Sequence, residues 1–335
     1  MIQGRDVVTL DTFSAEELRF VIERAREMKT DGHGASLQGR SLVMVFFDPS
    51  LRTRSSFSIA FSSQGGTVID MVASRDIWAL EMREGAVMDG IADEHVRDAA
   101  AVLSEYADVI AIRALARHDD WARERRDQVI VSFQKYATVP IFNMESVLDH
   151  PCQAWGDALT LTEEFGDLRG RKIALAWTYH PQTRPLAVPH GVGVMATKLG
   201  MDVTVCHPEG YELDHDVRET MELCAGDEGG SVRWTDDLQG GIEGADVVYA
   251  ASWGSTLHHG HPDDERELRR RHRDWRITRD LMAGTNDGRF LHAMPIRRNV
   301  EADDDVVDAP YSLVVPQAGN RLHIQRALFA EVLKT

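Results

Sequence analysis

The stretch "SLVMVFFDPSLRTRSSFSIAF", residues 41–61, joins an apolar run directly to a polar one. Residues 41–47 are apolar and rich in Val and Phe, which is typical of a buried strand. Residues 53–66 have the composition of a helix that two glycines end. Arg52 and Arg54 gather at the junction with several hydroxyl side chains. A strand that passes directly into a helix is the repeating unit of an α/β fold.

The same alternation continues along the chain. Strands are expected at 41–47, 67–72, 108–113 and 139–144, and later in "RKIALAWTYH", "MDVTVCHP", "SVRWT", "GADVVYAASW" and "RFLHAMPI". Helices are expected at 53–66, 95–107, 125–137 and 152–166, and in the amphipathic segment "NRLHIQRALFAEVLKT". Alternation on this scale predicts parallel sheets covered by helices on both faces. We therefore expect two doubly wound α/β domains that join near residues 145–155.

The composition argues against several classes of protein. Among the 335 residues, Lys and Arg number 37 and Asp and Glu 54, for a formal net charge of −17. Such a charge argues against nucleic acid or an anionic membrane as the main partner. Cys152, Cys206 and Cys224 are too few and too widely spaced for a disulfide framework. With no signal pattern and no apolar run of membrane-spanning length, we expect a cytoplasmic protein.

Polar residues gather where the predicted strands end. "DPSLRTRSS" follows the first strand, Arg113 ends "DVIAIR", "NMES" and "DHPCQ" follow the fourth strand, and "HAMPIRRN" follows the last. In open α/β sheets, ligands bind beyond the carboxyl ends of the strands. These segments are therefore the candidates for a binding site.

The junction after the first strand fits a phosphate-sized dianion. A helix that starts near residues 50–53 presents backbone N–H groups without intrahelical partners, and its dipole is positive at that end. Ser50 and Thr53 add hydroxyl donors, and Arg52 adds a two-pronged guanidinium. The alternative is an ordinary helix cap with two surface arginines. The stretch lacks a Gly-rich P-loop with its Lys, so a nucleoside triphosphate is not indicated.

Three motifs in this order resemble those of the aspartate and ornithine carbamoyltransferases. "DPSLRTRSSF" is similar to their Ser-x-Arg-Thr-Arg carbamoyl-phosphate motif, "HPCQ" at 150–153 to their second motif, and "FLHAMPIRRN" to an altered His-Cys-Leu-Pro motif. The segments "IWALEMREGAVMDGIADEH", "IFNMES", "WTYHPQTRPLAVP" and "ADVVYAASWG" are most similar to the branch that carbamoylates N-acetylornithine or N-succinylornithine. The resemblance extends over nearly the whole chain.

The resemblance implies an organisation as well as an activity. It implies a carbamoyl-phosphate-binding domain at 1–149, with the C-terminal helix 319–335 packing back on it, and an acceptor-binding domain at 150–318. In that branch the Pro-rich loop is threaded through a following loop, so the second domain would contain a trefoil-type knot. The protein would be a homotrimer without metal or cofactor. It would move a carbamoyl group to the side-chain amine of an N-acetylornithine-like acceptor in arginine biosynthesis.

The resemblance also assigns site residues. Carbamoyl phosphate would be bound by Ser50, Leu51, Arg52, Thr53, Trp78 of a neighbouring subunit, Arg113, His150, Gln153, His292 and Arg297. The residues with a catalytic part would be Arg52, Arg113, His150, Gln153 and Arg297, and the acceptor would be bound by Glu145, Asp93, Ala251, Ala293, Met294 and Glu301. From the residues alone, Arg113 also fits a surface ion pair, His150 a helix cap, Trp78 a core position and Glu145 a solvated carboxylate. The leaving phosphate can take the proton of the attacking amine, so no Ser/His/Asp triad is required.

Several positions depart from the family pattern on the acceptor side. Ala251 replaces a Lys, Ala293 a Cys, Met294 a Leu, Glu301 a Lys and Gly319 a Glu. The two lost lysines remove positive charge where an acceptor carboxylate or acyl group would lie, and Arg297, Arg298 and His180 are the candidate replacements. Asp93 argues against an acceptor that carries a succinyl group. The alternatives are another diamine or diamino acid, such as ornithine or 2,3-diaminopropionate, or a non-catalytic phosphate-binding regulatory homologue.

Two charged segments remain after these assignments. His258, His259 and His261 follow "ASWG", where either a metal site or, in preference, a variable acceptor loop is indicated. The densest charge run, "HPDDERELRRRHRDW" at 261–275, is expected to be a solvated helix face or loop.

Overall fold

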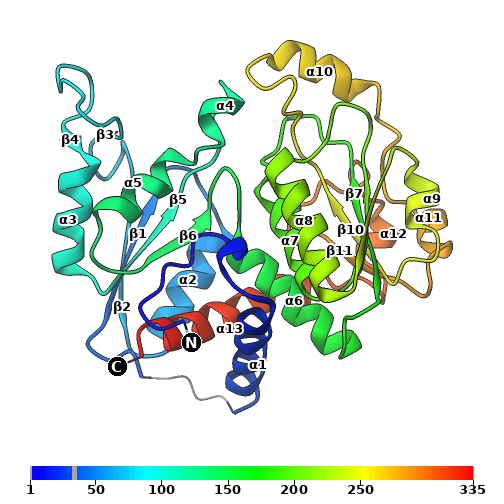
Figure 1. Cartoon of the computed structure of the whole chain (residues 1–335), viewed down its shortest axis with the longest axis horizontal. Coiled ribbons are helices and arrows are strands. Elements are labelled where there is room, and N and C mark those ends of the chain that lie inside the picture. Colours follow the sequence, from blue (N-terminus) through cyan, green and yellow to red (C-terminus); the bar gives the residue numbers. More distant parts are fainter. Residues whose placement is uncertain (1, 32–35, 335) are drawn as a thin grey trace.

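The computed structural model describes residues 2–31 and 36–334 and contains two parallel sheets, one in each lobe of Figure 1. The first sheet has the order β2-β1-β5-β6 and the second β11-β10-β7-β8-β9. The strands are β1 (Ser41–Phe46), β2 (Thr67–Val72), β5 (Val109–Arg113), β6 (Ile141–Glu145), β7 (Lys172–Trp177), β8 (Asp202–Cys206), β9 (Ser231–Thr235), β10 (Val247–Ala251) and β11 (Arg289–Leu291). The α/β class and the two parallel sheets are thus confirmed. A short pair, β3 (Leu80–Glu81) and β4 (Glu94–His95), was not expected.

Helices connect these strands. They are η1 (Leu10–Thr12), α1 (Ala15–Asp31), α2 (Arg52–Ser62), α3 (Val96–Tyr106), α4 (Trp121–Glu124), α5 (Gln128–Tyr136), α6 (Pro151–Phe165), α7 (Ala187–Lys198), α8 (His215–Glu228), α9 (Leu238–Ile242), α10 (Pro262–Arg270), α11 (Arg279–Ala283), α12 (Asp304–Val307) and α13 (Val314–Val332). Helix α6 runs from one lobe to the other, and α13 packs against α1, α2 and α6. Helix α13 begins earlier than the expected segment "NRLHIQ". No helix among the described residues is long and apolar enough to cross a membrane.

The central strands β1, β5, β7 and β10 are buried on both faces, because successive residues point to opposite sides of a sheet and helices cover both sides. In β1, Leu42 and Met44 join the core formed with α2 and α13, whereas Val43 and Val45 join the core formed with α3 and α5. In the second sheet, Ile173 and its alternate neighbours on β7 pack toward α7, and the intervening alanines pack toward α9 and α11. These continuous apolar strands explain why the sequence predicted the sheets correctly.

The strand order determines where the two sheets can bind a ligand. In the first sheet β1 lies between β2 and β5, and in the second β7 lies between β8 and β10. The connection that follows β1 therefore runs over one face of the first sheet and the connection that follows β5 runs over the other, and the same holds for β7 and β10 in the second sheet. Where two neighbouring connections diverge in this way, a crevice opens at the carboxyl ends of the two strands. The loops after β1, β5, β7 and β10 are the ones positioned at these two points.

The charge run at 261–275 differs from its expected solvated state. Within α10, Glu265 is 3 % exposed and Arg269 is 1 % exposed. The Nε of Arg269 donates to the Glu265 carboxylate at 3.0 Å, and its two Nη atoms donate to Ser252 Oγ at 2.9 Å and to the Trp253 carbonyl at 2.8 Å. The expectation was wrong for this face of the helix because the polar groups are buried together and satisfy one another.

Replacing Arg269 with Ala should lower the free energy of unfolding by about 3–5 kcal/mol, since the Glu265 carboxylate would remain buried without its cation. Urea unfolding followed by tryptophan fluorescence measures this loss. Arg271→Ala is the matched control, because Arg271 pairs with Glu267 on the exposed side of the same segment. Equal stabilities of the two variants would contradict the prediction.

Candidate active site

A cavity of about 340 Å³ lies between the carboxyl ends of the two sheets. Its wall is formed by residues from both sheets: Pro49, Ser50, Leu51, Arg52, Thr53, Arg113, Leu115, Glu145, His150, Gln153, Arg184, Pro185, Val188, Ala250, Ala251, Ser252, His292, Ala293, Met294, Pro295, Glu301 and Arg321. Most of the residues singled out from the sequence are thus brought together. The cavity has two halves. The first half is built on the first sheet together with α6 and α13, and the second half is built on the second sheet.

The first half begins at the N-terminus of α2. The Ser50 hydroxyl accepts the Thr53 N–H at 3.2 Å, and Leu51 at the helix start has no side-chain cap. Burial, together with the nearby Arg113 guanidinium, lowers the pKa of Arg52 from its ordinary value. Among the described residues Arg52 forms no ion pair, and its Nε is buried without a hydrogen-bond partner. The start of α2 is therefore cationic, and no described carboxylate pairs with Arg52 there.

Arg321 of α13 adds a second guanidinium to this half. Its Nη2 donates to Thr53 Oγ1 at 2.7 Å and to His150 Nε2 at 3.2 Å. Burial lowers the pKa of Arg321 to about 10, and burial together with Arg321 holds the pKa of His150 well below its usual range. His150 is therefore neutral. Because its Nε2 accepts from Arg321, its Nδ1 carries the proton, and this buried Nδ1 has no partner among the described residues.

Gln153 is oriented by a buried polar network. Its Nε2 donates to Asp157 Oδ1 at 2.7 Å, so the Gln153 carbonyl oxygen is left to accept a hydrogen bond. Asp157 also accepts from Gln317 Nε2 at 2.8 Å and from Tyr249 Oη at 2.9 Å. Burial raises the pKa of Asp157 to about 7. The network fixes which end of the Gln153 amide faces the cavity.

Arg113 and Glu145 form an ion pair in the cavity wall. They end the neighbouring strands β5 and β6, and their side chains are 9 % and 13 % exposed. Glu145 has a φ of 144°, a costly conformation for a residue with a side chain, and its N–H is bound by Asn143 Oδ1 at 2.9 Å. Arg113 is therefore a buried ion-paired residue, and Glu145 is not a freely solvated carboxylate.

The second half is formed at the ends of β10 and β11. Ala251 ends β10 and leaves open the space that a longer side chain would fill. The His292 ring lies 3.3 Å from Glu301 Oε1, and its Nδ1 accepts the Met294 N–H at 2.8 Å. Glu301, 2 % exposed, also accepts the Arg297 N–H at 2.7 Å. The Glu301 carboxylate thus holds the 292–297 segment in place.

Three residues assigned by resemblance do not line the cavity. Arg297 turns its side chain to His180, with 2.9 Å between Nε and Nε2. Trp78 is 54 % exposed, donates to Glu94 Oε2 at 2.6 Å, and belongs with Asp93 to the segment around β3 and β4 that projects from the first lobe in Figure 1. Arg298, named as a replacement cation, is paired with Asp304 and Asp308 on the surface.

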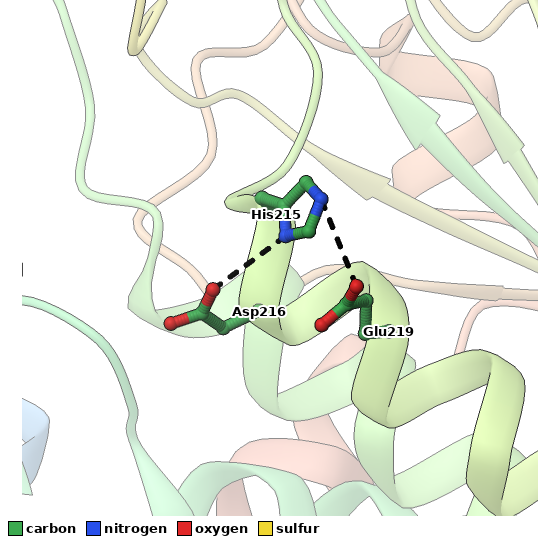
Figure 2. Close-up of side chains that lie close together, drawn as sticks. All are labelled: His215, Asp216 and Glu219. Atoms are coloured by element: carbon green, nitrogen blue, oxygen red, sulfur yellow. Dashed lines mark ion pairs between the residues drawn. The ribbon is translucent and has the colours of Figure 1, made fainter.

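The three histidines after "ASWG" do not form a metal cluster among the described residues. His259 instead lies 3.0 Å from Glu124 of the first lobe, and both side chains are nearly buried. Within residues 2–31 and 36–334, the one group with metal-like spacing is His215, Asp216 and Glu219 at the start of α8, shown in Figure 2. All three side chains are exposed and form ion pairs with one another, as such groups do without a metal.

The sequence analysis missed Arg321 and Arg184 as cavity residues. Arg321 lies within "NRLHIQRALFAEVLKT", which predicts an amphipathic helix but gives no sign of a site residue. Its approach to Thr53 depends on α13 packing between α2 and α6, which no local pattern records. Arg184 lies in the Pro-rich loop after β7, and only the position of that loop at the second crevice brings it to the cavity.

Two regions of the chain match the two domains of a known protein family. Residues 5–163 match the aspartate/ornithine carbamoyltransferase carbamoyl-P binding domain, and residues 186–332 match the Asp/Orn binding domain of the same family. The chain belongs to the aspartate/ornithine carbamoyltransferase family. It is a carbamoyltransferase, and Arg52 and Arg113 of the cavity lie within the residues matched to the carbamoyl-P binding domain, whereas Arg321 lies within those matched to the Asp/Orn binding domain.

Individual members of this carbamoyltransferase family are similar over nearly their whole length. The N-acetylornithine carbamoyltransferase of Xanthomonas campestris pv. campestris is 40% identical over 324 residues, 96% of this chain and 95% of that protein. The N-succinylornithine carbamoyltransferase of Bacteroides thetaiotaomicron is 33% identical, over 91% and 92% of the two chains. The crystal structure of an acetylornithine transcarbamylase complexed with acetylcitrulline superposes with a TM-score of 0.97 at 39% identity, covering 99% of this chain and 100% of that one.

Arg52→Ala should reduce the turnover of this carbamoyltransferase roughly 30- to 1,000-fold, because a charge-assisted contact to the leaving phosphate contributes about 2–4 kcal/mol in the transition state. Phosphate release under saturating acceptor measures the effect. Arg54→Ala is the control on the same helix, since Arg54 pairs with Asp70 and lies over the Phe46 ring outside the cavity. Wild-type turnover in a folded Arg52→Ala protein would contradict the assignment of this phosphate site.

Proposed function

We propose that this enzyme transfers the carbamoyl group of carbamoyl phosphate to the side-chain amine of N-acetylornithine and releases phosphate, a step of arginine biosynthesis. The observation that carries the proposal is the arginine-rich half of the cavity, which faces a second half with room for a small acceptor. The similarity to N-acetylornithine carbamoyltransferases, at 40% identity over 96% of the chain, supports this acceptor.

The residues of the first half have complementary parts in this reaction. The start of α2 with Arg52 and Arg321 binds the phosphate, and Arg113 lies between the phosphate and the carbamoyl oxygen. The protonated Nδ1 of His150 donates to the carbamoyl group, and the Gln153 carbonyl accepts from its amide. When the amine attacks the carbamoyl carbon, negative charge develops on that oxygen, and fixed donors stabilise it. The leaving phosphate accepts the proton of the amine.

The second half receives the acceptor. Ala293, Met294 and the 292–295 backbone surround the reacting amine, Ala251 leaves space for the acceptor, and Glu145 lies beside its path. Arg297 acts through His180 and the segment that Glu301 holds. These parts remain proposals for each residue, and Trp78 and Asp93 enter only through a neighbouring subunit.

We also propose the domain division and the knot that the family resemblance implies. The carbamoyl-phosphate-binding domain takes residues 1–149 with the C-terminal helix 319–335, and the acceptor domain takes 150–318. The packing of α13 on α1 and α2 supports the return of the C-terminus to the first domain. Contact between the Pro-rich loop and the loop after β10, where the Gly254 N–H donates to the Arg184 carbonyl at 2.9 Å, supports a threaded connection in the second.

The assembly that we propose is a homotrimer with shared sites. The projecting segment exposes apolar side chains that a neighbouring subunit would cover: Trp78 at 54 %, Val87 at 77 %, Met88 at 43 % and Ile91 at 93 %. An apolar group of this size on one segment is typical of a subunit contact. Trp78 would then reach the carbamoyl phosphate of the next subunit, since it does not line the cavity of its own.

Acceptor choice is the direct test of the proposed function. With carbamoyl phosphate, the enzyme should give the highest kcat/KM for N-acetylornithine in a comparison with N-succinylornithine, ornithine and 2,3-diaminopropionate, read as phosphate release and product mass. Preference for a free diamino acid would favour the specialised-pathway alternative, to which the loss of Lys at position 251 points. Absence of turnover with every amine would favour the regulatory homologue.

Subunit complementation tests the shared site. Trp78→Ala and Arg52→Ala proteins should each be trimers by light scattering and each have little activity. Mixed trimers, refolded or co-expressed, should regain part of the activity because one of the three sites in each mixed trimer combines an intact Arg52 with an intact Trp78 of the neighbouring chain. An active monomer, or mixed trimers no more active than their parents, would refute the proposal.

A further inference from the structure

Arg184 occupies a fixed position at the crevice of the second sheet. It lies in the loop between β7 and α7 and lines the cavity beside Pro185 and Val188. Its carbonyl accepts the Gly254 N–H at 2.9 Å. The adjacent Thr183 hydroxyl donates to Glu265 at 2.6 Å, and Glu265 is in turn held by Arg269. The loop backbone is therefore anchored to the buried ion pair of α10.

The Arg184 guanidinium has no ion-pair or hydrogen-bond partner among residues 2–31 and 36–334, whereas the two carboxylates that line the cavity are already engaged. Glu145 is paired with Arg113. Glu301 faces His292 and accepts the Arg297 N–H. The second half of the cavity thus has a half-buried cation and no free carboxylate to neutralise it, an arrangement that favours an anionic ligand.

This cation is separate from the phosphate-binding arginines. Arg52, Arg113 and Arg321 come from α2, β5 and α13, and Arg113 and Arg52 both lower the pKa of Arg321. Arg184 comes from the loop after β7 of the second sheet, near His180, whose pKa is lowered mainly by burial, with smaller contributions from Arg184 and Arg297. The cavity therefore has a cationic group at each end.

The position of Arg184 matches the charge missing at Ala251. Strands β7 and β10 are neighbours, with Trp177 opposite Ala251, so the loop after β7 and the end of β10 meet at the same crevice. Both Arg184 and Ala251 line the cavity there. We propose that Arg184 binds the carboxylate of the acceptor and replaces the Lys that similar enzymes have at position 251. This inference rests on the proposed carbamoyl transfer and defines the acceptor class.

The charges in this half of the cavity favour an acceptor whose α-amine is acylated over one whose α-amine is free. A free diamino acid would place its α-ammonium beside Arg184 with no unengaged carboxylate among the described cavity residues to accept it. Acylation removes that ammonium and leaves one carboxylate, which the guanidinium can bind through two hydrogen bonds. The positive end of the α7 dipole, which begins three residues after Arg184, adds to the attraction.

The experiment compares two acceptors that differ only in the carboxylate, N-acetylornithine and N-acetyl-1,4-diaminobutane. Wild-type enzyme should prefer the first strongly. In Arg184→Ala, the KM for N-acetylornithine should rise about 10- to 100-fold, while kcat/KM for the decarboxylated compound and the KM for carbamoyl phosphate should change little. Adding Ala251→Lys to Arg184→Ala should restore much of the preference. Gln182→Ala, an exposed neutral change in the same loop, is the control.

Two kinetic results would overturn the inference. One is an unchanged preference between the two acceptors in Arg184→Ala. The other is a raised KM for carbamoyl phosphate with no change for N-acetylornithine, which would assign Arg184 to the phosphate instead.

A binding measurement separates this inference from the proposed function. N-acetylnorvaline, which is N-acetylornithine without its terminal amine, is titrated calorimetrically into wild type and Arg184→Ala in the presence of inorganic phosphate. Binding that is lost only in the variant supports the carboxylate site even if no acceptor is turned over. Equal binding by both proteins, or none by wild type, overturns it.

Discussion

The structure depends on holding like charges together at the ends of buried strands. Arg52, Arg113 and Arg321 approach one another in one wall of the cavity, and only Arg113 has a carboxylate partner among the described residues. Their mutual repulsion and desolvation oppose folding in the absence of an anion. A phosphate dianion bound beside them would remove that penalty, so we expect these charges to favour the binding of carbamoyl phosphate.

Two members of this wall, Arg321 and Gln153, are held by polar groups deeper in the fold. Arg321 contacts Thr53 and His150, and Gln153 is oriented through Asp157 by Gln317 and Tyr249. Among these supports, Asp157 lies on α6 and Gln317 on α13, whereas Thr53 lies on α2 and Tyr249 on β10. A substitution in α6 or α13 would therefore alter carbamoyl-phosphate binding without touching the ligand.

The second half of the cavity is also supported by buried polar groups, but it contains fewer charged side chains. A buried pair in α10, Glu265 with Arg269, anchors the Pro-rich loop and the loop after β10. At this crevice Ala251 carries no charge, and Arg184, from the loop after the neighbouring strand β7, supplies a cation. Moving a cation from one loop to another at the same crevice would keep the positive potential at the ligand while changing the shape of the cavity. That change is a route by which acceptor choice can vary on one fold.

The sequence by itself determined the α/β class, the succession of strands along the chain, and the cluster of polar residues at the start of α2. Local patterns suffice there, because apolar strands buried on both faces and a polar helix start are written in consecutive residues. Tertiary structure alone decided which distant side chains meet. It brought Arg321 to Thr53, turned Arg297 toward His180 and away from the cavity, buried Glu265 and Arg269 inside a charged run, and set Arg184 beside Ala251. These contacts join segments far apart in the chain, and their geometry depends on how helices and loops pack on two sheets, which no local pattern encodes.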